Sequence, residues 1–478
     1  MITYIKNRWN IEGGYRVLMT TAFPLIMSSA SWSLLHFIDR MFLAWYSSDA
    51  VAAAMPAGIL NFTLISVFIG TASYAGTFIA QYFGANMHRR IGPVLWQGLY
   101  IGIAAGALIM LCIPFSNRIF TAIGHQEPVR SLEAGYFAIL TIAAIPAIIN
   151  ATMAGFFSGL GRTMPVMWIN LAATGINLVL DYLFIFGKFG IPEMGMNGAA
   201  IATDIAAISA TFMWAALIFT KKNNDRYAVR KGWRFNRDLF FRLLRFGLPN
   251  GLHMFIDVAG FTVFILIMGR LGTTALAAST IAFNINSIAW MPMFGFGMAV
   301  SILVGQYLGA NRPASAEKAV WTGFHVTFLY TLVVASFYAF APGLFLMPYQ
   351  SGSSDPAFPA ICALTAVLLR FVAVYSLFDT CNIIFASAVK GAGDTRFVMF
   401  MLAIMSSALL IVPAYVVLVV LKKGVYAAWV VLTVYCVALA AAFVLRFLGG
   451  KWKSMRVIEE NIVHPVPHKV PEVFSVEV

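Results

Sequence analysis

Four carboxylates stand inside stretches of this sequence that are otherwise apolar: Asp39, Asp181, Asp257 and Asp379. An ionised carboxylate near the centre of a bilayer costs about 2.5–3.5 kcal/mol or more unless it faces water or a partner. These acids are therefore the first residues for which a function must be weighed. In such a setting a carboxyl group can bind a small cation or carry a proton.

The N-terminal half combines two of these acids with an amide. Asn177 and Asp181 are four residues apart and share a helix face, as do His36 and Asp39, which are three apart. Two carboxylates and an amide offer hard oxygen ligands for Na⁺, or an acid pair whose mutual repulsion favours holding a proton. The alternative is structural: Asp39 pairs with adjacent Arg40, while Asn177 and Asp181 stabilise helix packing.

The C-terminal half holds a second acidic set. His253 and Asp257 are four residues apart, and Asp379 lies deep in a later apolar stretch. His253 could relay protons, or simply form a hydrogen bond near the end of its helix. Arg370 lies nine residues before Asp379, about 180° around a helix, so we do not expect these two to pair. The candidate accessory residues are therefore His36, His253 and Arg40.

The elements that carry these residues are membrane spans. Hydrophobic residues make up 60% of the 478 positions and charged residues 11%, against about 25% charged in soluble proteins. Runs of 18 or more apolar residues are long enough to cross a bilayer. We predict twelve, at residues 17–45, 51–83, 94–115, 132–157, 164–186, 197–220, 246–269, 273–308, 319–341, 358–389, 397–421 and 425–448.

The two halves of the sequence are copies of one unit. Residues 81–86 read Gln-Tyr-Phe-Gly-Ala-Asn, and residues 306–311 read Gln-Tyr-Leu-Gly-Ala-Asn. The same offset of 225 residues aligns Pro24 with Pro249 and Asn61 with Asn286. Six spans per copy make the repeats parallel, and a transporter with two such lobes around a central cavity is the plan this predicts.

We expect an all-α membrane protein with the N-lobe at residues 1–220 and a basic cytoplasmic linker at 221–245. The C-lobe follows at 246–448 and a cytoplasmic tail at 449–478. Of the 32 Lys and Arg, 24 fall on one side of the predicted spans and six on the other. This asymmetry predicts a multi-pass protein of the inner or plasma membrane with both termini in the cytoplasm.

The formal charge of +13 does not indicate nucleic acid, because nine basic residues gather in the linker beside aromatic ones. That pattern suits anionic lipid headgroups. The four cysteines lie inside spans without CxxC spacing, so neither a disulfide nor a metal framework is predicted. We find no HExxH, GxSxG or P-loop motif. We therefore expect no enzyme, no catalytic residue, no cofactor and no ATP hydrolysis.

The sequence resembles the multidrug and toxic compound extrusion (MATE) family over nearly its whole length. The features that carry the resemblance are the two six-span lobes, the repeated Gln-Tyr-x-Gly-Ala, and Gly-x-Gly-x-Thr at residues 159–163 and 391–395. The stretch from Asn177 to Gly187 completes them. The resemblance implies a multidrug efflux antiporter that exports organic cations or amphipathic drugs in exchange for Na⁺ or H⁺, and we expect a monomer.

Carried over by residue, the resemblance places the coupling cation or proton at acids of both lobes. Asp39, Asn177 and Asp181 match the cation site of one branch of the family. Asp257 and Asp379 match acidic positions of another branch, where the first is more often Glu. Na⁺ is thus expected at the first set or at the second, and Arg40 replaces the small polar residue expected after the first acid.

Three other functions fit the sequence less well. A lipid-linked oligosaccharide flippase of the same superfamily would need more cavity Arg and Lys to meet pyrophosphate, whereas only Arg40 and Arg370 lie inside the spans apart from Arg446 at the end of the last one. A channel or receptor would leave the tandem lobes unexplained. A membrane-embedded enzyme would need a nucleophile, metal or phosphate constellation that the motifs do not supply.

Overall fold

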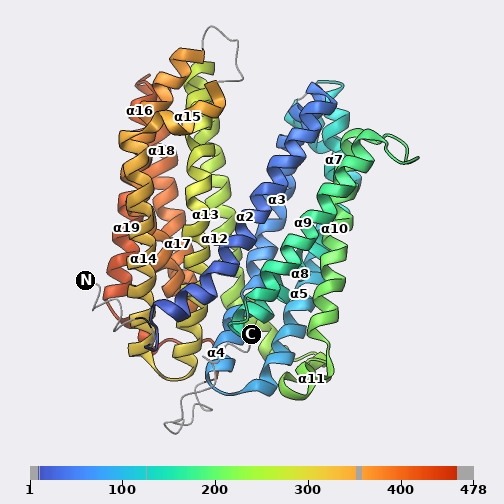
Figure 1. The fold of residues 1–478 in the computed structure, drawn as a ribbon, viewed down its shortest axis with the longest axis vertical. Coiled ribbons are helices and arrows are strands. Elements are labelled where there is room, and N and C mark those ends of the chain that lie inside the picture. Colours follow the sequence, from blue (N-terminus) through green and yellow to red (C-terminus); the bar gives the residue numbers. More distant parts are fainter. Residues whose placement is uncertain (1–8, 10, 125, 351–357, 460–478) are drawn as a thin grey trace. The chain divides into compact units, whose positions relative to one another are not determined.

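The computed structural model describes residues 9, 11–124, 126–350 and 358–459, and every regular element within them is a helix (Figure 1). The longer elements before the linker are α2 (Tyr15–Tyr46), α3 (Ser48–Ser73), α4 (Ala75–Gly84), α5 (Ile91–Met110), α6 (Ser116–Ile123), α7 (Val129–Ile142), α8 (Ala144–Gly159), α9 (Met164–Phe186) and α10 (Gly195–Ile218). Those from the linker onward are α11 (Lys221–Tyr227), α12 (Arg237–Met268), α13 (Thr273–Gly309), α14 (Pro313–Phe340), α15 (Pro342–Gln350), α16 (Phe358–Ala392), α17 (Thr395–Met405), α18 (Val412–Tyr415) and α19 (Val425–Leu448).

The prediction of an all-α protein with twelve spans is confirmed. Within the described residues, eleven helices are long and apolar enough to cross a membrane, and a twelfth span is the pair α7 and α8. These two helices meet at Ala143 with a bend of 47°. The eleventh span is also irregular, because two π-helical segments, Ser406–Ile411 and Val416–Val420, flank α18. Pro413, which has no backbone N–H to donate, lies between them.

The described chain forms two compact units. We call them the N-terminal unit (Met27–Phe255, Gly309–Asn311 and residues 456–459) and the C-terminal unit (the described residues up to Ile26, Ile256–Leu308 and Arg312–Met455). The chain changes unit within α2 and within α12, shortly after the proline inside each helix, Pro24 and Pro249. The lobe bounds derived from the sequence stay a prediction.

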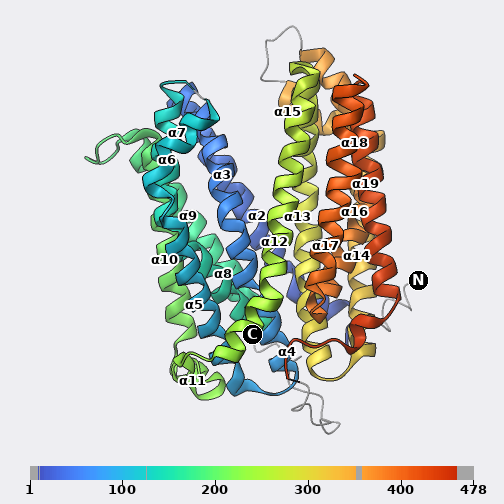
Figure 2. The ribbon, with the colours of Figure 1, turned by 180° about the vertical axis from the view of Figure 1, so that it is seen from behind.

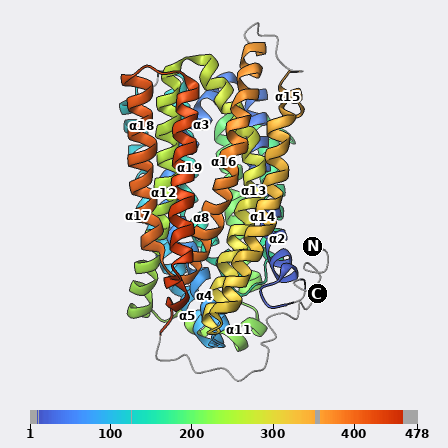
Figure 3. The ribbon, with the colours of Figure 1, turned by 90° about the vertical axis from the view of Figure 1, so that its left-hand side faces the viewer.

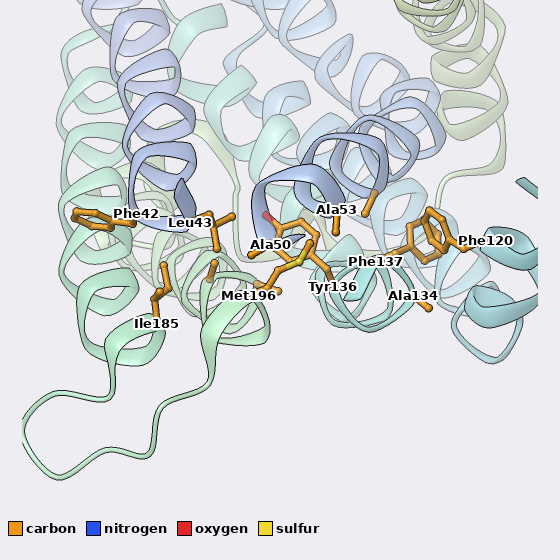
Figure 4. Packing of buried hydrophobic residues seen from close by; sticks show 13 residues of the cluster. Phe42, Leu43, Ala50, Ala53, Phe120, Ala134, Tyr136, Phe137, Ile185 and Met196 are labelled. Atoms are coloured by element: carbon orange, nitrogen blue, oxygen red, sulfur yellow. The ribbon is translucent and has the colours of Figure 1, made fainter. Parts of the chain in front are cut away.

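Each unit is built from tightly packed long helices. In the N-terminal unit α9 and α10 lie side by side (Figure 2), and in the C-terminal unit α16 lies between α14 and α19 (Figure 3). One apolar core of the N-terminal unit joins α2, α3, α7, α9 and α10; Phe42, Ala53, Phe137, Ile185 and Met196 are among its buried side chains (Figure 4). This core holds α2 against α9, the two helices that carry the N-terminal acids.

Glycine contacts repeat in the two units. In the N-terminal unit a Cβ on Gly70 of α3 would lie 2.7 Å from the Cα of Gly251 on α12. In the C-terminal unit a Cβ on Gly295 of α13 would lie 2.5 Å from a side-chain carbon of Ile26 on α2. Gly70 and Gly295 are repeat equivalents, and so are Ile26 and Gly251. In both units, therefore, the second span of one repeat packs on the first span of the other.

Candidate functional site

Asp39, Asn177 and Asp181 lie together inside the N-terminal unit. Asp39 comes from α2, and the other two are one turn apart on α9. With its amide nitrogen toward the acids, Asn177 donates to Asp39 Oδ1 and to Asp181 Oδ2, each at 3.1 Å. The two carboxyl groups are also within hydrogen-bonding reach of each other. The structure thus brings together all three residues of the predicted N-terminal set.

The orientation of the Asn177 amide decides the chemistry of this set. With Nδ2 directed instead at Thr203 Oγ1 of α10, 3.3 Å away, the amide oxygen faces the two carboxyl groups. One orientation therefore offers a donor to two acceptors, and the other offers three oxygens to a cation. Amide, carboxylate and hydroxyl oxygens are hard ligands of the kind that alkali and alkaline-earth cations take.

These side chains are removed from solvent. Asn177 and Asp181 are fully buried, and Asp39 is 7% exposed. Asp181 Oδ1 has no hydrogen-bond partner in the structure. A buried carboxylate with an unsatisfied oxygen is unfavourable unless it takes up a proton or meets a cation or water. The arrangement is therefore suited to binding a positive charge.

The predicted neighbours of Asp39 point elsewhere. Arg40 is exposed and acts on Asp39 only through its charge, so the alternative of a simple Asp39–Arg40 ion pair has no support among the ion pairs of the described residues. His36 is exposed, and its ring lies edge-on to Trp32 with centroids 4.9 Å apart.

The acids of the C-terminal unit are less enclosed. Asp379 on α16 is half-buried and accepts a hydrogen bond from Asn382 Nδ2 at 3.2 Å. Asp257 on α12 is exposed and lies within electrostatic reach of both Asp379 and Lys390 of α16. The boundary between the two units falls between His253 and Asp257. Lys390 is thus a basic neighbour of the C-terminal acids that the sequence analysis did not predict.

Two further buried acids lie in the N-terminal unit and were missed from the sequence. Asp204 of α10, beside Thr203, is 8% exposed, and its Oδ1 has no hydrogen-bond partner in the structure. Glu133 of α7 is fully buried. Both fall inside predicted spans, at 197–220 and 132–157, so the rule that singled out the other four acids would have found them. Tyr136 of α7 lies within electrostatic reach of Asp39, Asp181 and Asp204.

No group of three or more His, Cys, Asp and Glu side chains arranged to hold a metal ion occurs in the described part of the chain. The N-terminal set instead combines two carboxyl groups with amide and hydroxyl oxygens. Such a set suits a weakly held monovalent cation or a proton better than a tightly bound transition metal, which prefers imidazole and thiolate ligands.

Parallel six-span repeats with acids inside the spans define a helical membrane protein of the secondary-transporter class. The sequence model of the MatE family matches residues 24–183 and 249–416, one match in each repeat. The chain belongs to this family, the multidrug and toxic compound extrusion transporters, as the resemblance in the sequence had indicated.

Named relatives cover almost the whole chain. A probable multidrug resistance protein NorM of Bradyrhizobium diazoefficiens is 28% identical over 432 residues, which is 89% of this chain and 91% of that protein. The protein of the same name in Pseudomonas putida is 29% identical over 453 residues, 93% of this chain and 95% of its own.

Solved structures share the fold. A multidrug resistance MATE family transporter of the MOP superfamily, in an outward-facing conformation, superposes with a TM-score of 0.83 at 19% identity, covering 92% of this chain and 96% of its own. A MOP superfamily transporter from Pyrococcus furiosus superposes with a TM-score of 0.82 at 20% identity and with the same coverage. Its binding pocket is described as having reverse polarity, which suggests a different function for that protein.

Proposed function

We propose that this protein is a secondary active multidrug efflux antiporter that exports organic cations or amphipathic drugs in exchange for Na⁺ or H⁺. The family membership supports transport, and the names of the relatives support multidrug resistance as its purpose. The observation that carries the coupling step is the burial of the Asp39 and Asp181 carboxyl groups together beside the Asn177 amide. We expect the transporter to work as a monomer without ATP.

The coupling follows from the chemistry of these three side chains. A proton shared by Asp39 and Asp181, or a Na⁺ ion facing the Asn177 oxygen, neutralises a charge that is otherwise buried without compensation. Ion and drug then compete, each favouring a different arrangement of the two lobes, so that downhill entry of the ion drives extrusion. An ion with equal affinity for both arrangements would drive nothing.

We place the coupling ion in the N-terminal unit rather than in the C-terminal one. The N-terminal acids are buried together and share one amide, whereas Asp257 is exposed and lies within the field of Lys390. A basic side chain near Asp257 already supplies positive charge, which lowers the affinity for a further cation. Asp379, which is half-buried and accepts a hydrogen bond from Asn382, is then the acid that meets a cationic drug.

The test is efflux from proteoliposomes that are loaded with a fluorescent organic cation and driven separately by a Na⁺ gradient and by a pH gradient. Asp39→Asn should lower ion-driven efflux at least about tenfold, because the shared proton or ion loses a ligand. Asp49→Asn removes the same charge from an exposed position at the start of α3 and should behave as wild type. Wild-type efflux by Asp39→Asn would remove that residue from coupling.

The same vesicles show which acidic set couples the ion, and they distinguish drug efflux from the flippase activity. Asp379→Asn should weaken drug affinity, and neither Asp379→Asn nor Asp257→Asn should abolish the dependence of efflux on the ion gradient. If these variants lose the dependence on the ion gradient while Asp39→Asn keeps it, the coupling site lies in the C-terminal unit. Wild-type protein that moves a lipid-linked pyrophosphate across the bilayer, but no organic cation, would favour the flippase.

A further inference from the structure

The motif written twice in the sequence binds a segment of the chain in each unit. In the N-terminal unit, Gln81 Oε1 accepts a hydrogen bond from the backbone N–H of Val457 at 2.8 Å. The neighbouring Tyr82 hydroxyl donates to Glu459 Oε2 at 2.6 Å. The first copy of the motif therefore holds the segment that follows α19.

The second copy does the same with the start of the chain. In the C-terminal unit, the Gly13 N–H donates to the Tyr307 hydroxyl at 2.8 Å, and Thr322 donates to the Gly13 carbonyl at 2.8 Å. Next to it, Glu12 pairs with Arg312 at 2.5 Å. A tyrosine of the repeated motif and an arginine thus hold a glutamate-bearing segment in both units. Transport chemistry at the acids inside the spans does not explain this recurrence.

Charge and apolar burial both fix the C-terminal segment. Arg242, at the start of α12, forms an ion pair with Glu459 and also donates to the Tyr82 hydroxyl at 3.1 Å. Val457 and Ile458 are 1% and 4% exposed. Burial would raise the pKa of Glu459, but the hydrogen bonds from Arg242 and Tyr82 outweigh it and hold the pKa below its usual value. The segment is therefore docked as an anion.

The residues just before this segment are anchored in the other unit. Trp452 is fully buried and stacks on Phe447 of α19 with ring centroids 5.0 Å apart. Lys453 forms an ion pair with Glu317 of α14 at 2.7 Å. The chain passes from the C-terminal to the N-terminal unit between Met455 and Arg456.

The connection between these two anchors is short. Four Cα–Cα steps join Lys453 to Val457, so an extended chain spans at most about 14 Å between them. The connection cannot extend beyond this length. A rearrangement of the two units that moves Lys453 and Val457 further apart than about 14 Å must therefore release one of the anchors. The anchor at Trp452 is an aromatic side chain without exposed surface, whereas the Arg242 and Glu459 side chains are 24% and 29% exposed.

We propose that residues 456–459 are a releasable strap, which docks on Gln81, Tyr82 and Arg242 and leaves this surface during each transport cycle. The occupant of the surface is the chain's own C-terminal segment, and the step that releases it rests on the proposed function. Docking lowers the free energy of one lobe arrangement and so sets how often the other is reached. The strap thereby regulates turnover.

Docking is tested by trypsin cleavage after Arg456, followed by mass spectrometry of the released C-terminal peptide. Glu459→Gln and Tyr82→Phe should be cleaved about fivefold faster than wild type, because each loses a hydrogen bond of the docked state. Asp225→Asn, which removes an exposed acid on α11, is the matched control and should not differ. Arg242→Glu should be cleaved fast, whereas Arg242→Lys, which keeps the positive charge, should stay closer to wild type. Equal cleavage of all variants would overturn docking.

Release is tested in everted vesicles with a Na⁺ or pH gradient and the organic cation present. Wild type should be cleaved several-fold faster while it transports than at rest, and Glu459→Gln should be fast in both conditions. Cleavage of wild type that is the same at rest and during measured efflux would overturn release. Absence of ion-driven efflux in wild type would instead contradict the proposed function, and the docking result would stand.

The strap is not a pH switch near neutrality. The pKa of Glu459 is lowered in the docked segment. Its contribution to the stability of docking is therefore complete above the ordinary pKa of Glu, about 4.3, and is lost only as the pH falls through the lower pKa of the docked state. The cleavage rate of wild type at rest, divided by the rate on an unstructured peptide at the same pH, should therefore be constant between about pH 6 and pH 8.

Discussion

At the scale of single residues, the N-terminal unit concentrates buried acid. Asp39, Asp181 and Asp204 are each less than 9% exposed, and one oxygen of Asp181 and one of Asp204 have no hydrogen-bond partner in the structure. Asp204 follows Thr203, which contacts Asn177. Carboxyl groups in this state destabilise a fold unless they bind something, so their presence indicates a use.

We expect Asp204→Asn to raise the melting temperature of the detergent-solubilised protein by a few degrees, because it removes a buried ionisable group, and to slow ion-driven efflux. Thermal unfolding and proteoliposome efflux measure the two effects. Asp225→Asn, at an exposed position, should change neither. A variant that loses stability while transporting normally would show that Asp204 has a structural role.

At the scale of helices, glycines set how closely the spans approach. A Cβ on Gly251 of α12 would overlap the Val67 carbonyl oxygen of α3 and lie 2.5 Å from Thr71 Oγ1. In contrast, Gly58 of α3 and Gly175 of α9 have no atom within 4 Å of the position where a Cβ would stand. The close contact between α3 and α12 therefore requires a residue without a side chain at position 251.

Gly251→Ala should destabilise the protein by about 1–3 kcal/mol, because the backbone of α3 must move to admit the methyl group. Gly175→Ala is the control, since alanine favours a helix over glycine by about 0.8–1.0 kcal/mol and meets no neighbour there. The stability of both variants is measured by their melting temperatures in detergent and by their monodisperse yield in size-exclusion chromatography. Equal stability of the two variants would contradict the close contact.

At the scale of the whole molecule, the two repeats exchange the first part of their first spans. The start of α2 belongs to the C-terminal unit and the start of α12 to the N-terminal unit. Both termini are predicted to face the cytoplasm because Lys and Arg are unevenly distributed between the two sides of the spans. On this topology the linker and the loop after α9 face opposite sides of the membrane.

This topology predicts the labelling of single cysteines in a cysteine-free background. Lys188→Cys, after α9, should react with a membrane-impermeant maleimide in intact cells, and Lys222→Cys on α11 should not; both side chains are exposed. Both should react once the membrane is permeabilised. Labelling of Lys222→Cys alone in intact cells would reverse the orientation.

The sequence by itself determined the spans, the duplication and the acids worth testing. Span length and apolarity are properties of a continuous stretch, and the repeat of residues 81–86 at 306–311 is legible without coordinates. Tertiary structure decided which acids meet. The contact between Asp39 and Asn177 joins residues 138 positions apart, and it depends on how α2 packs on α9.

The same reason explains what the sequence did not disclose. The docking of Glu459 on Tyr82 crosses 377 positions, and the exchange of α2 and α12 between units follows from side-chain packing near Gly70 and Gly295. Hydropathy and charge counts predict whether a segment lies in lipid or in water. They do not predict which other segment it packs against, because that depends on the fit of side chains in the folded protein.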